Sequence, residues 1–230
     1  GGSTDKTVSL IKNFIKKDKL SEIIKLIEEK DVNRPQGRNI GVSKSKYNII
    51  AITDAGCVLD RKWLEEIVAP FTNQRTDVVS GYYKAKSSSV FQRCMGIYTL
   101  VMPGRVEPQQ FLPSARSMAV RKHVWREVGG FPENFPFNED YVFAHTLKRY
   151  GKTFHFTKKA VVYWQPRENL KKAFFMFYYF AKGDAQAKLF RPKVIFIFSR
   201  YAIGLVLFSS FLITQANIIL NTIYMLLIAY

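Results

Sequence analysis

The chain has 230 residues, of which 47% are hydrophobic and 15% aromatic, and this composition excludes a generally disordered protein. Lysine and arginine number 35 against 18 aspartates and glutamates, so the net charge is +17. Such a charge indicates an anionic partner: nucleic acid, phospholipid headgroups or a phosphorylated substrate. The two cysteines, Cys57 and Cys94, lack metal-ligand spacing, which argues against a disulfide framework or a zinc site and fits a reducing compartment.

The predicted elements alternate between strand and helix along the chain, whereas 21–30 is ambiguous between the two. Asp60 is expected to cap one helix, and Asn138 another that Gly151 follows. This alternation predicts an α/β fold with a largely parallel sheet, in which ligands bind beyond the carboxyl ends of the strands. The predicted strands are 48–53, 77–83, 117–120 and 153–164, and the predicted helices are 61–71, 88–102 (a helix or a buried segment), 121–128 and 138–151.

The C-terminal part lacks charged residues from Tyr201 to Tyr230. Because a membrane span needs about 20 apolar residues, Val194 to Thr214 is expected to form one transmembrane helix. The polar stretch Thr214 to Asn217 could turn the chain into a second, incomplete helix. A buried helix of a soluble protein is the alternative.

Residues 166–193 combine a block of aromatic side chains with flanking cations, which predicts an amphipathic segment lying in the membrane interface. By the positive-inside rule, the cations hold everything upstream on the cytoplasmic side of a cell membrane. The expected division is a catalytic domain at 1–165, this segment at 166–193, and a transmembrane helix or helical hairpin at 194–230. The cations are Lys171, Lys172, Lys182, Lys188, Arg191 and Lys193.

A candidate site lies where the predicted strand at 48–53 delivers Asp54, followed by the small residues Ala55 and Gly56. Small residues let a phosphate or a backbone approach closely, so the stretch suits a nucleotide or a metal-bridged diphosphate. A turn or N-cap aspartate explains the same residues equally well. The residues alone leave both interpretations open.

A second acidic feature is the pair Glu139 and Asp140 in the first turn of a predicted helix. The helix dipole stabilises carboxylates there, and that alone accounts for the pair. However, the glycines and prolines of "VGGFPENFPF" fix the backbone path that leads to these acids. A carboxylate held in this way could act as a general base.

Four stretches in this order resemble glycosyltransferase family 2, whose members are inverting enzymes, and together they cover essentially the whole chain. The stretches are "GGSTDKT", "GRNIGVSKSKYNIIAITDAGCVLDRKWLEEIV", "SARSMAVRKHVWREVGGFPENFPFNEDYVFAHTLKRYG" and "AVVYWQPRENLKKAFF". The resemblance implies a GT-A fold, a mixed sheet flanked by helices and followed by C-terminal transmembrane helices. It also implies a nucleotide-sugar donor and a lipid or saccharide acceptor, with synthesis of a polysaccharide or glycolipid at the membrane and no nucleic-acid partner.

The resemblance also implies roles for the acids. Asp54 matches the first acid of the Asp-x-Asp motif, which contacts the nucleotide and the metal-diphosphate region, with Ala55 and Gly56 beside it at the donor. Asp140 matches the acid of the Glu-Asp motif that serves as the base. Glu139 is then expected to orient the acceptor or Asp140.

Three further residues are predicted to bind the donor. Arg38 and Asn39 match an Arg-Asn pair near the donor site, and Arg38 suits a diphosphate. Arg116 is a candidate phosphate contact, for which a solvated arginine is the alternative.

The sequence departs from the family pattern at Gly56, where a second acid is expected, and at Trp164, where many members have histidine. Asp54 is therefore the predicted metal ligand of a weak Mg²⁺ or Mn²⁺ site that forms only with the donor. "QPR", residues 165–167, matches the Gln-x-x-Arg-Trp motif of processive synthases only in part, which favours single addition.

Two alternatives remain. In the family, the stretch "GGSTDKT" follows an apolar strand ending in an aspartate, but here Gly1 is the first residue, so the first strands are expected to be missing and the fragment could be inactive. The other alternative is a non-catalytic basic domain, attached to the membrane, that binds anionic lipid or nucleic acid.

Overall fold

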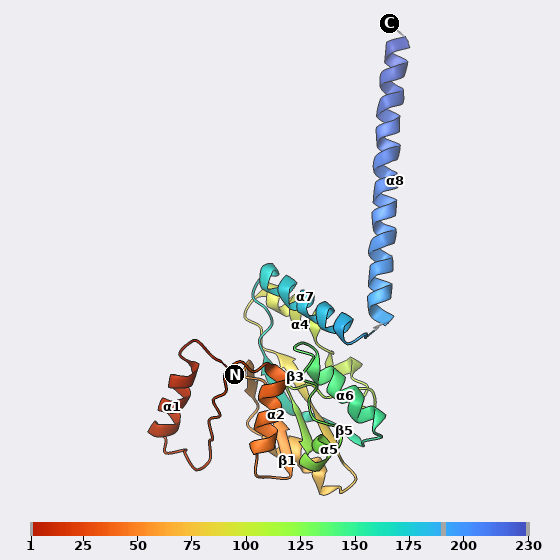
Figure 1. Cartoon of the computed structure of the whole chain (residues 1–230). Helices are drawn as coiled ribbons and strands as arrows, with labels where there is room; N and C mark the ends of the chain where they lie inside the picture. Colours follow the sequence, from red (N-terminus) through yellow and green to blue (C-terminus); the bar gives the residue numbers. More distant parts are fainter. Residues whose placement is uncertain (1, 190–191, 229–230) are drawn as a thin grey trace. The chain divides into compact units, whose positions relative to one another are not determined.

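The computed structural model describes residues 2–189 and 192–228; Arg191 and both ends of the chain lie outside the described residues. The chain divides into two compact units, 1–187 and 188–230. The first unit holds a sheet with helices on both faces, and the second is one long helix (Figure 1). The helices are α1 (Thr7–Lys17), α2 (Arg34–Lys44), α3 (Trp63–Val68), α4 (Val90–Thr99), α5 (Lys122–Glu127), α6 (Glu139–Arg149), α7 (Leu170–Gln186) and α8 (Pro192–Ile228), with short 3₁₀ turns at Ala69–Thr72 and Pro103–Arg105.

The sheet has the order β1-β4-β3-β5-β2 and is mixed, as the family resemblance implied. The expectation of a largely parallel sheet is wrong, because β3–β5 is the only parallel pairing among the described strands. Nevertheless β1, β3 and β5 run in the same direction, so their carboxyl ends meet at one edge of the sheet, where β4 begins. The strands are β1 (Ile49–Ile52), β2 (Cys57–Leu59), β3 (Val78–Ala85), β4 (Met118–Arg121) and β5 (Phe154–Trp164).

Side chains of the central strands alternate between two apolar layers. Val78 packs into the layer beneath α2, α5 and α6, whereas its neighbour Val79 packs into the layer beneath α3. Met118 and Ala119 divide in the same way. This alternation follows from the two-residue period of a strand and explains why both faces of the sheet are covered.

Helix α2 begins with a capping box that the sequence analysis did not use. The Asn33 side chain accepts from the Gln36 N–H, the Gln36 side chain accepts from the Asn33 N–H, and Pro35 stands in the first turn. The glycines at 37 and 41 lower helix propensity, yet these caps support the helix. As a result the pair Arg38 and Asn39 lies on a helix.

Some expected local features differ in the structure. Residues 21–30 form neither helix nor strand. Helix α3 begins at Trp63 with Lys62 at its N-cap position, so Asp60 does not cap it; the Asp60 carboxylate accepts instead from the Lys62 N–H at 3.1 Å and the Tyr163 hydroxyl at 3.3 Å. One oxygen of the Asp60 carboxylate therefore binds a hydroxyl of β5, and only the other oxygen binds a backbone N–H near the start of α3.

Asn138 occupies the N-cap position of α6, but its side chain does not cap that helix. Its backbone is left-handed (φ 58°), and its Nδ2 donates to the Phe180 carbonyl and, at 2.7 Å, to Asp184 Oδ1 in α7. Gly183 permits this contact, since a Cβ there would lie 2.9 Å from the Phe137 Cβ. The tertiary contact replaces the predicted cap.

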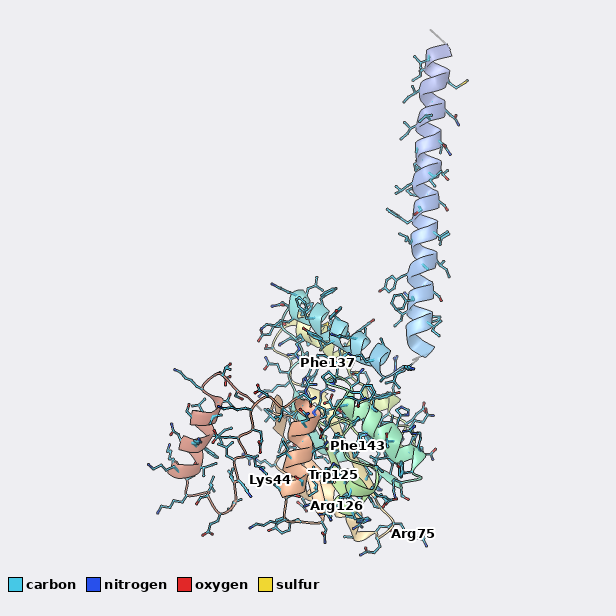
Figure 2. All side chains as sticks on the ribbon, viewed as in Figure 1. Lys44, Arg75, Trp125, Arg126, Phe137 and Phe143 are labelled. Carbon is cyan, nitrogen blue, oxygen red and sulfur yellow. The ribbon has the colours of Figure 1, made fainter. Side chains whose placement is uncertain are left out.

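Helix α8 is continuous, and the chain does not turn at Thr214–Asn217. The Thr214 hydroxyl donates to the Ser210 carbonyl within the helix, which satisfies a polar group of that stretch without a turn. Its residues Ile195–Leu227 have a mean hydropathy of 2.0, long and apolar enough by length and composition to cross a membrane. The side chains drawn on this helix project from it on all sides (Figure 2).

Candidate active site

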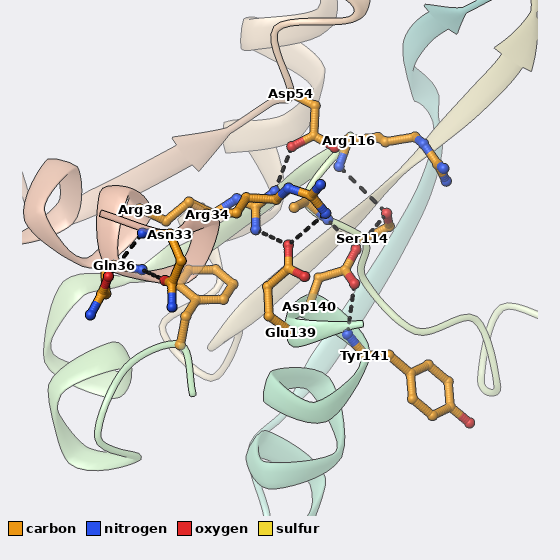
Figure 3. A network of polar contacts seen from close by, with 12 residues as sticks. Asn33, Arg34, Gln36, Arg38, Asp54, Ser114, Arg116, Glu139, Asp140 and Tyr141 are labelled. Carbon is orange, nitrogen blue, oxygen red and sulfur yellow. Dashed lines mark hydrogen bonds and ion pairs between the residues drawn. The ribbon is translucent and has the colours of Figure 1, made fainter. Parts of the chain in front are cut away.

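Arg38 joins the two acidic features at the shared edge of the sheet (Figure 3). Its Nη2 donates to Asp54 Oδ1 at 2.6 Å, and its Nη1 donates to Glu139 Oε1. The Glu139 side chain is 3% exposed and the Arg38 side chain 12%, so this pair is buried, whereas Asp54 is 38% exposed. Burial by itself would lower the pKa of Arg38, but the Glu139 and Asp54 carboxylates outweigh burial and raise it.

Arg34 adds a second cation to Glu139, with Nη1 3.7 Å from Oε1. Arg34 and Arg38 are four residues apart on α2 and therefore lie on the same face of the helix. The sequence analysis missed Arg34, although the capping box that starts α2 would have placed it on this face. Two arginines thus converge on one buried carboxylate.

Asp140 is held by donors from two segments. Its Oδ2 accepts from the Ser114 hydroxyl at 2.9 Å and the Ala115 N–H at 3.0 Å, and its Oδ1 accepts from the Tyr141 N–H. These bonds fix the orientation of a carboxylate that is partly exposed. Sequence reasoning missed Ser114, since its contact with Asp140 depends on the strands that bring the two segments together.

Arg116 follows Ser114 closely and is held by aromatic rings. Its guanidinium carbon lies 4.9 Å from the centre of the Trp164 ring and 5.5 Å from that of Tyr83. Trp164, which stands at the position where many relatives carry histidine, therefore offers a ring face to a cation. No carboxylate of the described chain pairs with Arg116, so its N–H donors remain available to an anion.

Tyr83 lies between Arg116 and the apolar interior. Burial raises the pKa of its hydroxyl. The positive charge of Arg116 acts to lower this pKa, and the negative charge of Asp140 acts to raise it.

A cavity of about 650 Å³ opens at this edge of the sheet. Asp54, Ala55, Gly56 and Arg116 line it on one side, and α7 contributes the opposite wall. A Cβ at Gly56 would meet no atom within 4 Å. The residues from α7 are Lys172, Met176, Tyr179 and Phe180.

A second hollow of about 490 Å³ shares part of this lining. Arg34, Asp54 and Ala55 face both hollows, and Arg38 lines the second. A bound ligand that spans the two would therefore meet Asp54 and two arginines.

The structure thus brings Asp54, Arg38, Glu139 and Arg116 to one edge of the sheet. Asn39 and the acidic pair differ from what the sequence predicted. Asn39 points elsewhere: its amide accepts from the Phe131 N–H, donates to the Phe131 carbonyl and to Glu133, and so fastens the loop before α6. The buried Glu139 contacts Arg38. Neither acid of the pair is among the residues that line the 650 Å³ cavity.

The donors present fit a weak metal site at most. Within residues 2–189 and 192–228, no three acids, histidines or cysteines gather as metal ligands. Asp54 and Glu168 are the carboxylates that line the cavity; Arg38 already binds Asp54 Oδ1, and Lys172 binds Glu168 Oε2 at 2.6 Å. Most ligands of an ion there would have to come from a bound phosphate and water.

Comparison with protein families identifies the family of the chain. The family described as "Glycosyl transferase family 2" matches residues 1–122, more than half of the chain. The chain belongs to glycosyl transferase family 2. The predicted family is therefore confirmed, although the match ends before Glu139 and Asp140. No curated protein matches the chain.

Solved structures confirm the GT-A fold. A mannosyltransferase from Pyrobaculum calidifontis, PcManGT, in complex with GDP-Man and Mn²⁺, has a TM-score of 0.55 and 17% identity, covering 75% of this chain and 48% of that one. GalNAc-T7 with UDP, GalNAc and Mn²⁺ has a TM-score of 0.54 and 14% identity, covering 72% of this chain and 36% of that one. The chain thus spans about half or less of these proteins.

We predict that Arg38→Met lowers the free energy of unfolding by about 3 kcal/mol, because it leaves the buried Glu139 carboxylate with the more distant Arg34 alone. Adding Glu139→Gln should recover at least about 1 kcal/mol of that loss, since the uncompensated charge is removed. Urea unfolding in detergent, followed by tryptophan fluorescence, measures both.

Arg126→Met is the matched control, because Arg126 is exposed; its effect should stay within about 0.5 kcal/mol. Strictly additive losses from Arg38→Met and Glu139→Gln would contradict the buried pair.

Proposed function

We propose that this chain transfers a sugar from a nucleotide-sugar donor to an acceptor hydroxyl with inversion, in polysaccharide or glycolipid synthesis at the cytoplasmic face of a membrane. The observation that carries the proposal is the ion network in which Arg38 links Asp54, at the end of β1, to Glu139, at the start of α6. This network sets the donor-side acid and the Glu-Asp pair beside one hollow edge of the sheet. A donor-side acid, Asp54, a candidate base, Asp140, and a cavity lined by arginines suit the displacement of a nucleoside diphosphate.

In the proposed reaction Asp140 accepts the proton of the acceptor hydroxyl. The acceptor oxygen forms a bond to the anomeric carbon on the face opposite the leaving group, and the bond from that carbon to the diphosphate oxygen breaks. The electron pair leaves with the nucleoside diphosphate. Ser114 and Ala115 aim the Asp140 carboxylate at the acceptor hydroxyl.

The leaving diphosphate is stabilised by cations already at the cavity. Arg116 presents N–H donors that no carboxylate in residues 2–189 and 192–228 pairs with, and Arg34 lies at the same cavity. Ala55 and Gly56 let the phosphates approach the backbone. Glu139 acts through Arg38, which it holds against Asp54.

A divalent metal belongs to the proposal as a weak, donor-dependent cofactor. The two structural neighbours are complexes with Mn²⁺, and Asp54 would hold Mg²⁺ or Mn²⁺ together with phosphate oxygens and water. When bound, the ion would supply positive charge to the departing diphosphate.

Membrane attachment rests on the two C-terminal helices. Helix α8 is long and apolar enough to span, and α7 exposes aromatic side chains such as Phe174 and Tyr178. Lys182 and Lys188 shortly precede the apolar stretch that begins at Ile195, which supports a cytoplasmic orientation.

The non-catalytic alternative treats the acids as helix-end charges. Glu139 binds Arg38 and Asp140 binds the segment at 114–115, so both make tertiary contacts that a simple role at the helix start does not require. This favours the enzyme over a basic domain that binds lipid or nucleic acid.

The first test of the proposal is Asp140→Asn. We expect turnover to fall by about 10² or more while affinity for GDP or UDP is nearly unchanged, because proton acceptance is lost and the shape is kept. Release of nucleoside diphosphate from a panel of GDP- and UDP-sugars by the full protein measures turnover.

Ser114→Ala should lower turnover less than Asp140→Asn, since it removes one aiming bond and keeps the base. Asp18→Asn is the control, because Asp18 is an exposed acid at the C-terminal end of α1. Unimpaired turnover in Asp140→Asn would remove Asp140 from the base role.

For the metal, we expect negligible binding of Mg²⁺ or Mn²⁺ to the protein alone and measurable binding once GDP or UDP is present. Asp54→Ala should abolish this coupling. Gly56→Asp should strengthen it, because the open space at Gly56 admits a second carboxylate. Isothermal titration calorimetry with and without nucleotide measures the effect.

Gly104→Asp is the matched control, since it also adds an acid in open space, outside the cavity. Tight metal binding without nucleotide, or full activity in excess chelator, would show that the metal proposal is wrong.

For membrane attachment, alkaline carbonate extraction should leave the full protein in the membrane pellet, and a reporter fused next to Lys172 should be active in the cytoplasm. Release into the supernatant would contradict the span, and a reporter active outside the cytoplasm would contradict the orientation.

A further inference from the structure

An apolar groove of about 450 Å³ lies between the carboxyl end of β3 and helix α4. Arg93, Gly96, Ile97 and Leu100 line it from the α4 side at spacings of three and four residues, which places them on one helical face. Tyr83 and its neighbours in β3 form the opposite side. The proposed transfer reaction does not involve this groove.

Gly96 brings the two sides of the groove together. A Cβ on this residue would lie 2.8 Å from the Ala85 Cβ, so α4 approaches β3 more closely here than a larger residue would allow. One residue further on, Ile97 is 66% exposed although it lines the groove. An exposed aliphatic side chain beside an apolar hollow favours contact with an apolar ligand.

The polar part of the groove is cationic. Lys84 and Arg93 both line it and are exposed. Within the described residues, neither lies within ion-pair distance of a carboxylate. The groove therefore complements a ligand that is apolar along its length and negatively charged at one end.

The Tyr83 ring connects the groove with the candidate active site. Tyr83 lines the groove, and the same ring lies 5.5 Å from the guanidinium carbon of Arg116, which lines the 650 Å³ cavity with Asp54. A ligand lying in the groove thus has one end near the cavity.

The groove also adjoins an apolar surface. Tyr98 of α4 is 66% exposed and packs against Phe177 of α7, with ring centres 5.7 Å apart. Helix α7 exposes Phe174 and Tyr178. Figure 1 shows α4 and α7 side by side, and the Tyr98–Phe177 contact joins them, so two helices with exposed aromatic side chains adjoin the groove, which suits a membrane interface.

We propose that the acceptor is a single-chain amphiphile that carries a phosphate group as well as the hydroxyl that receives the sugar; its apolar chain lies in this groove and its phosphate binds Lys84 and Arg93. This inference rests on the proposed glycosyltransferase function, whose acceptor it narrows from a lipid or a saccharide to a lipid. Burial stabilises an alkyl chain by about 0.8 kcal/mol per CH₂ group, whereas a saccharide would need hydrogen-bond partners that the apolar lining does not provide.

The test uses the full chain in nanodiscs of zwitterionic phospholipid and an alkyl phosphate probe that carries a diazirine on its chain. After irradiation, mass spectrometry should find the probe on peptides covering residues 82–102. Decyl phosphate should compete with the labelling, whereas decanol, which lacks the charge, and inorganic phosphate, which lacks the chain, should compete at least tenfold more weakly.

Variants separate the groove from the rest of the surface. Ile97→Asp, and Lys84→Glu with Arg93→Glu, should each lower labelling of residues 82–102 about tenfold, because they put negative charge against the chain or the phosphate. Leu64→Asp is the control: Leu64 is a similarly exposed aliphatic residue, 59%, but lies on α3, and labelling should be unchanged.

Labelling confined to α8, or equal competition by decanol, would overturn the proposal, as would equal competition by inorganic phosphate. Titration with GDP and UDP on the same preparations distinguishes this failure from failure of the proposed function. Nucleotide binding without labelling of the groove refutes the amphiphile alone. Labelling of the groove without nucleotide binding supports the amphiphile site and refutes the glycosyltransferase proposal.

Discussion

The candidate site depends on one buried guanidinium. Arg38 is the only described residue that bonds both Asp54 and Glu139, so the end of β1 and the start of α6 are held at a fixed separation by α2. Because Glu139 is 3% exposed, its charge would be strongly unfavourable without this partner. The caps of α2 therefore matter for chemistry as well as stability, since they set the position of the guanidinium.

The direction of the strands explains why the other groups gather at the same place. β1, β3 and β5 point the same way, although β4 runs between two of them in the opposite direction. Their ends supply Asp54, Tyr83 and Trp164, and the segment entering β4 supplies Arg116. In this chain an aromatic residue at 164 holds an arginine beside the candidate diphosphate site, and so a positive charge is present without any metal ligand at that position.

Local sequence patterns were enough to predict several elements of the fold. The strands β1, β3 and β5 could be predicted because their sequences are runs rich in β-branched and aromatic residues, and the structure buries those runs between two apolar layers. Helix α2 escaped prediction, since Gly37 and Gly41 weaken a helix that its caps nevertheless sustain. The acids could be predicted as site residues from their motifs, but their partners could not, because Arg34 and Ser114 meet them through tertiary contacts. Asn138 failed as a cap for the same reason.

The contact of Asn138 with α7 has a thermodynamic consequence. The residue immediately before the two acids is kept left-handed while its amide bonds α7, and Gly183 lets the helix sit against it. A shift of α7 therefore changes the free energy of the turn from which α6 starts. This coupling is reciprocal by thermodynamic linkage. If binding of α7 to a membrane surface changes the affinity of Glu139 and Asp140 for a ligand, then that ligand changes the affinity of α7 for the membrane surface by the same factor.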